Sequence, residues 1–188
     1  MTYSLKNVFY LGFSQEYTNS YSAGQESIQP IDVSAYVDPI SKGRTRGQGL
    51  AVYRVHQAVT NDTGTPCAVA ETASMGMALT VKPYTTTGEQ LTGEVAYLDT
   101  APSNDLVIQS SLYLGGASGG PGVTSGELLT VCEPSDEVPY VVVRDTIFSI
   151  MNTSLALNAD VLNSYRMECA MISLDTATLN QLLRTQTA

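Results

Sequence analysis

Short apolar segments separated by turn-forming residues run through this chain from one end to the other. The clearest is GLAVYRVHQAVT at 49–60, in which side chains alternate between two faces with a period of two residues. A turn signal, NDTGTP at 61–66, follows it directly. Segments this short and this often interrupted favour strands joined by turns over long amphipathic helices.

The same pattern predicts a series of strands and one helix. The expected strands lie at 4–13, 28–37, 49–60, 67–72, 75–82, 94–98, 105–114, 127–133, 138–144, 145–152 and 165–174. Only the C-terminal tail indicates a helix, which Asp175 can cap and in which Leu179, Leu182 and Leu183 fall together. A brief helix or coil at 155–163 is a second candidate. The spacing predicts an all-β sandwich or barrel, with 1–188 as a single domain.

Strict alternation in the segment 49–60 assigns its side chains to two faces. One face takes Leu50, Val52, Arg54, His56 and Ala58, and the other takes Ala51, Tyr53, Val55, Gln57 and Val59.

The charge balance excludes one function class. Eighteen acidic residues against nine basic ones give a formal charge of −9, whereas general nucleic-acid binding needs a local excess of cations. The 188 residues can bury roughly 70% of the surface that the unfolded chain exposes, so no metal or disulfide is required for folding. We expect a soluble chain, because neither an N-terminal signal sequence nor a membrane-length apolar run is visible.

The three cysteines are dispersed and form no C-x-x-C pair. We interpret them as small buried apolar groups, with a bridge between Cys132 and Cys169 left open as an alternative. Asn61 and Asn152 match the glycosylation sequon, a pattern that is common by chance.

The loop GGASGGPG at 115–122 resembles the nucleophile loop of trypsin-like proteases. A catalytic Ser118 would need a base held by a carboxylate, and the only histidine, His56, lies in the middle of a predicted strand. Ala117 stands where the protease pattern has aspartate. We therefore interpret the segment as a glycine-rich connecting loop and His56 as a half-buried strand histidine.

Metal and glycosidase sites find little support. His56 lacks the neighbouring histidines or paired cysteines that zinc requires. Two groups of carboxylates could in principle form glycosidase pairs, and the segment CEPSDE at 132–137 could hold Ca²⁺, but without any tryptophan or regular ligand spacing we expect solvated loop charges. They are Glu94, Asp99 and Asp105, and Glu133, Asp136 and Glu137.

One charge feature points to a partner. The stretch SKGRTRG at 41–47 places Lys42, Arg44 and Arg46 within five residues of an otherwise acidic chain. It is either a solvated loop or a basic strip that contacts a neighbouring subunit, lipid head groups or packaged genome.

Two stretches carry a family resemblance: AYVDPISKGRTRGQGLAVYRVHQAV at 35–59 and YRMECAMISLD at 165–175. Together with the chain length and the leucine-rich tail, they resemble the small major capsid proteins of sphaerolipoviruses, which are icosahedral, internal-membrane viruses of halophilic archaea. The low lysine count agrees with a salt-adapted host.

The resemblance implies a single jelly-roll β-sandwich of about eight strands with a short C-terminal helix, standing perpendicular to the capsid shell. It implies partners, namely copies of this chain, a second coat protein in pseudo-hexameric capsomers, and membrane lipids beneath them. It implies a protein made in the host cytoplasm and located in the virion, with no catalysis, cofactor, metal or small-molecule substrate. A phage tail or other β-sandwich binding module, and a serine hydrolase using Ser118 and His56, are the alternatives.

Overall fold

The computed structural model describes residues 7–38, 46–61, 73–81, 106–114, 126–154, 157 and 159–187. Nine strands and one helix follow one another along these residues. They are β1 (Val8–Tyr17), β2 (Glu26–Asp32), β3 (Arg46–Asn61), β4 (Ala73–Thr80), β5 (Leu106–Leu114), β6 (Gly126–Cys132), β7 (Tyr140–Val142), β8 (Thr146–Thr153), β9 (Val161–Asp175) and α1 (Thr176–Thr187).

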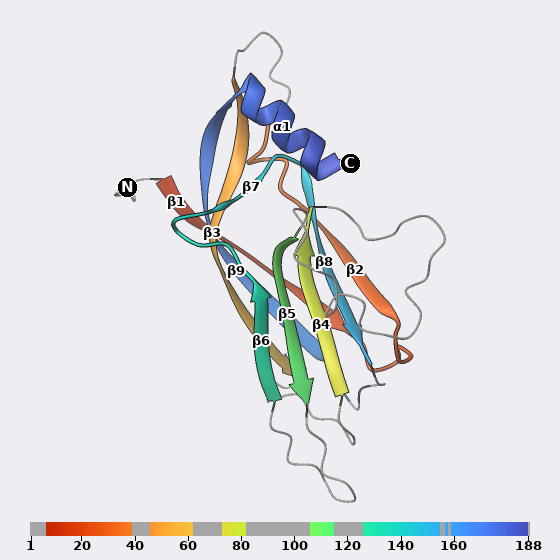
Figure 1. Ribbon diagram of the computed structural model, residues 1–188. Helices are drawn as coiled ribbons and strands as arrows, with labels where there is room; N and C mark the ends of the chain where they lie inside the picture. Colours follow the sequence, from red (N-terminus) through yellow and green to blue (C-terminus); the bar gives the residue numbers. More distant parts are fainter. Residues whose placement is uncertain are drawn as a thin grey trace, which may run out of the picture.

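The strands form two antiparallel sheets that pack face to face, with α1 at one end of the sandwich (Figure 1). The first sheet has the order β1-β9-β3-β7, and the second has the order β2-β8-β4-β5-β6. Strands distant in sequence are therefore neighbours: β9 lies between β1 and β3, and β8 lies between β2 and β4. Eight strands wound in this order are a jelly roll. The predicted fold class is confirmed, and β6 adds a ninth strand at the edge of the second sheet.

Most predicted elements are present, with different limits. The helix begins directly after Asp175, whose carboxylate accepts a hydrogen bond from the backbone N–H of Thr178 at 2.8 Å, as an N-cap does. The described residues of the 155–163 segment contain no helix, and its end belongs to β9. The predicted strands at 67–72 and 94–98 lie outside the described residues.

The predicted faces of β3 are wrong beyond its middle. The pairing register with β9 shifts between Val52 and Arg54, which is a β-bulge that inserts one extra residue and exchanges the two faces. Leu50 and Val52 lie in the core, but Val55 joins them there, whereas Arg54, His56 and Ala58 are exposed. Period-two counting cannot detect an inserted residue, so it placed Arg54 and His56 on the same face as Leu50 and Val52.

Between the sheets, two apolar clusters form the core. The larger contains Leu50, Leu79, Ile147 and Met167, and the smaller contains Tyr17, Met75, Met77 and Met151. Buried polar side chains lie among these clusters and join the sheets.

Side-chain hydrogen bonds link strands of opposite sheets, among them one that joins β3 to β5 and one that joins β1 to β8. The Ser110 hydroxyl of β5 donates to the Gln57 side-chain oxygen of β3 at 2.6 Å. The Ser149 hydroxyl of β8 donates to the Gln15 side-chain oxygen of β1. Because each bond satisfies a buried polar atom in one geometry only, these pairs fix how the sheets sit on each other.

Helix α1 covers one end of the sandwich. Leu179 packs with Val143 and Leu174, and Leu182 and Leu183 lie against the same cluster. The predicted leucine face is confirmed. In the described part of the chain, no helix has the length and apolar character needed to cross a lipid bilayer.

Candidate functional site

The basic strip predicted at 42–46 is only partly visible. Lys42 and Arg44 lie outside the described residues. Arg46 is the exposed first residue of β3 and lies opposite Asp175 on β9. Hydrogen bonds from Thr178 and the nearby Arg46 charge lower the pKa of the Asp175 carboxyl. The one visible member of the strip therefore borders the start of α1.

His56 lies within a strand, as predicted. Its side chain is 44% exposed on the outer face of the first sheet, and its Nε2 lies 2.8 Å from Oε1 of Glu168 on β9. Arg166 is its neighbour in the strand register. Ser118, the other residue of the hydrolase alternative, lies outside the described residues. The visible half of the hydrolase alternative is a histidine–carboxylate contact on the outer face of the first sheet.

The same outer face holds two further contacts between charged or aromatic groups. The Arg166 guanidinium carbon lies 4.6 Å from the centroid of the Tyr10 ring, in a cation–π contact. Arg54 and Asp136 form an exposed ion pair at 3.3 Å. Ion pairs this open to solvent contribute little to stability. Arg54 and His56 thus each have an acidic neighbour on this face.

The carboxylate candidates do not assemble into a site. Glu133, Asp136 and Glu137 are exposed, and Asp136 is the residue paired with Arg54. Nowhere in the described ranges do three His, Cys, Asp or Glu side chains gather closely enough to hold a metal ion. Glu94, Asp99 and Asp105 lie outside those ranges.

The remaining sequence candidates are now placed. Cys132 and Cys169 are both free thiols, so the alternative of a bridge between them is wrong. Cys169 is buried in the core as predicted, and burial raises the pKa of its thiol to about 12. Asn61 ends β3 and is partly exposed, whereas Asn152 is 0% exposed on β8. The sequon at Asn152 is therefore inaccessible to a glycosylating enzyme in the folded protein.

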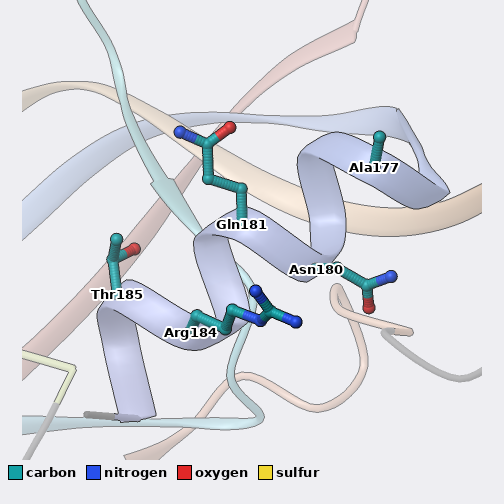
Figure 2. A pocket seen from close by; sticks show the side chains of 5 residues that line it. All are labelled: Ala177, Asn180, Gln181, Arg184 and Thr185. Carbon is teal, nitrogen blue, oxygen red and sulfur yellow. The ribbon is translucent and has the colours of Figure 1, made fainter.

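Five side chains of α1 line a pocket (Figure 2). Its volume is about 300 Å³, and the described residues that line it are Ala177, Asn180, Gln181, Arg184 and Thr185. The Thr185 hydroxyl donates to the Leu182 carbonyl of the same helix. Within this described lining, Arg184 is the only charged group, so no nucleophile is paired with a base here.

Sequence reasoning missed one residue that closes the end of the first sheet. Gln186 is 2% exposed, its side-chain oxygen accepts from the Val143 N–H at 3.2 Å, and its side-chain nitrogen donates to the Val141 carbonyl at 2.6 Å. The amide thus pairs with β7 as a neighbouring strand would. No local signal marks this role, because a glutamine near a helix end is ordinarily exposed.

Comparison with known proteins gives a structural answer only. No family model and no curated protein sequence matches the chain. Among solved structures, a mutant VP1 pentamer of Washington University polyomavirus matches with a TM-score of 0.51 and 10% identity, over 93% of this chain and 95% of that one. Trichodysplasia spinulosa-associated polyomavirus VP1 has a TM-score of 0.48 and 8% identity, over 93% and 97%. New Jersey polyomavirus VP1 has a TM-score of 0.47 and 8% identity, over 89% and 100%.

The chain shares its fold with viral capsid proteins. The Washington University polyomavirus VP1 match spans nearly all of both chains. At 10% identity it establishes the jelly roll and leaves function to be argued separately.

Proposed function

We propose that this chain is a structural coat protein of a virus, with 1–188 forming one jelly-roll capsid domain. The strand order β1-β9-β3-β7 and β2-β8-β4-β5 carries the proposal, because it is that of a jelly roll. A viral coat protein, polyomavirus VP1, matches this structure over nearly its whole length at only 10% sequence identity. The outer face of the first sheet agrees with the proposal: Arg54 pairs there with Asp136 and His56 contacts Glu168, and the described residues bring no three metal-ligating side chains together.

The finer proposal is a sphaerolipovirus-like coat. In it, copies of this chain combine with a second coat protein in pseudo-hexameric capsomers of an icosahedral shell, located in the virion above an internal membrane. Its support is the resemblance of residues 35–59 and 165–175 together with the low lysine count. Lys42, Arg44 and Arg46 are its proposed contact strip toward a partner subunit, lipid or genome. Self-association is also reasonable for a chain whose structural neighbour is described as a pentamer.

Electron microscopy of the purified protein tests the coat role. The expected result at high salt and high protein concentration is rings, capsomers or closed shells, alone or with the second coat protein. Tubes or tail rings would favour the tail-module alternative, and a strictly monomeric protein under all these conditions would contradict the coat role.

A second experiment tests the proposed lack of catalysis. A fluorophosphonate probe labels only activated serines, so we expect no labelling above that of the heat-denatured protein. Stoichiometric labelling at Ser118 that is lost in a His56→Ala variant would replace the coat proposal with a hydrolase.

A further inference from the structure

The methionines of this chain differ sharply in their exposure. Four of them belong to the two apolar core clusters and are 0% exposed: Met75, Met77, Met151 and Met167. Met171 on β9 is 50% exposed, and Met1 lies outside the described residues. Peroxides convert a methionine thioether into a sulfoxide, and in a folded protein they react with the sulfur atoms that they can reach. Among the described residues, Met171 is therefore the methionine that is open to this reaction.

An amide donor lies beside this exposed sulfur. The side-chain nitrogen of Gln48 on β3 donates to Sδ of Met171 at 3.0 Å and to the Tyr36 carbonyl at 3.1 Å. Asp38 and Gln48 exchange two backbone hydrogen bonds, both at 3.0 Å, which hold the glutamine backbone in place. A thioether sulfur is a weak acceptor, whereas a sulfoxide is strongly polar and its oxygen accepts well. An oxygen added to Sδ would therefore lie within reach of a donor that is already positioned.

We propose that Met171 is a site of reversible oxidation by hydroperoxides and that Gln48 holds the sulfoxide that forms there. A lone pair of Sδ attacks one oxygen of hydrogen peroxide, so that an S–O bond forms as the O–O bond breaks. The sulfur loses two electrons, and the second peroxide oxygen takes up the proton of the transferred oxygen and leaves as water. In the reverse step, which methionine sulfoxide reductases catalyse, two thiols supply the electrons and the oxygen is released as water. The inference does not depend on the coat function.

The position of Met171 allows the fold to survive this change. A sulfoxide at Met75 or Met151 would place a strongly polar group among the apolar side chains of the smaller core cluster, where it has no solvent to bind. At Met171 the added oxygen keeps contact with water and gains the Gln48 donor. Oxidation would thus turn an exposed apolar side chain into a polar one on a chain that remains folded.

The core contains a matched comparison for the two requirements, exposure and an amide donor. The side-chain nitrogen of Gln57 donates to Sδ of Met77 at 3.3 Å, so Met77 has the same kind of neighbour as Met171. Met77 is 0% exposed. The two methionines therefore differ in exposure while sharing the donor, and their reaction rates separate the two effects.

The first test treats the full chain with hydrogen peroxide and follows each methionine by mass spectrometry of its peptides. In the folded protein we expect Met171 to be oxidised at least tenfold faster than Met77 and the other core methionines, on the order expected for burial of the sulfur. In urea the rates should converge, because unfolding exposes every sulfur. Folded-state rates that are equal at Met171 and Met77 would overturn the oxidation site.

A second test measures the role of Gln48. Gln48→Ala removes the donor to Sδ and also the bond to Tyr36, so we compare the change in urea midpoint caused by oxidation in the parent chain and in the variant. The loss of the Tyr36 bond is common to both forms of the variant and cancels. Oxidation should lower the midpoint more in Gln48→Ala than in the parent, and equal changes would contradict the hold on the sulfoxide.

Two controls complete the design. Met171→Leu should keep its midpoint under the same peroxide treatment, and a shift in this variant would show that oxidation elsewhere causes the effect and would overturn the assignment to Met171. In the parent chain, nuclear magnetic resonance should show the Gln48 side-chain amide protons moving downfield on oxidation, as expected for a stronger acceptor. Unchanged amide signals on a fully oxidised Met171 would refute the Gln48 contact without the use of any variant.

Discussion

Gln186 provides the sharpest test of how this fold protects its sheet edge. In Gln186→Ala, the Val143 N–H and the Val141 carbonyl lose their partners on α1. Val143 is 0% exposed, so its N–H is left buried without a hydrogen bond, which costs about 1–3 kcal/mol. The Val141 residue is only partly buried, so water can reach its carbonyl and the added cost there is at most about 1 kcal/mol.

The expected loss in the free energy of unfolding is therefore about 1–4 kcal/mol. Gln181→Ala is the matched control, since it makes the same chemical change on the exposed side of the same helix. Any gain from the higher helix propensity of alanine is similar in both variants and cancels in the comparison.

Urea unfolding followed by circular dichroism measures the difference. We expect a lower midpoint for Gln186→Ala than for Gln181→Ala at an unchanged slope, together with faster hydrogen exchange at the Val143 amide. If the two variants agree within about 0.5 kcal/mol, α1 does not seal the β7 edge through this side chain and the argument from unsatisfied polar groups fails.

Three further predictions follow from particular contacts. Gly47→Ala should lower the free energy of unfolding by about 1–3 kcal/mol, because the new Cβ would lie 2.6 Å from the Leu179 side chain of α1. Gly12→Ala, whose new Cβ would have its nearest contact at 3.7 Å, should be close to neutral in the same urea denaturation assay. Equal losses in the two variants would refute the role of crowding at Gly47. Because the folded-state pKa of Asp175 is lowered, its carboxylate stabilises the folded protein above the unfolded pKa near 4, and this stabilisation is lost as the pH falls through the folded-state pKa. Asp175→Asn should keep the N-cap of α1 and weaken this acid dependence, whereas Asp175→Ala should lose both. Helical circular dichroism from pH 7 to pH 2 measures the difference. Iodoacetamide at pH 8 should leave Cys169 unmodified in the folded protein, since its buried thiol has a pKa near 12, and should modify partly exposed Cys132 faster; mass spectrometry showing equal rates would contradict the buried assignment.

The local features of this fold could be predicted from the sequence because each depends on neighbouring residues. Turn residues mark where strands end, and Asp175 followed by spaced leucines predicted a capped helix that the structure contains. The basic strip was also visible as a local pattern, although of its members only Arg46 lies in the described structure.

What depended on distant contacts was decided by the tertiary structure. The bulge at Val52–Arg54 arises from pairing with β9 and reverses the faces of β3, which no count along the strand reveals. The hydrogen bonds of Gln15, Gln57 and Gln186 form with residues on other strands or at the end of β7, which the fold brings close to them. The sequence by itself determined which segments become strands and where the helix starts, because propensity and capping act over a few residues. Only the folded chain decided which strands became neighbours, because burial and hydrogen bonding act between residues that are far apart in sequence.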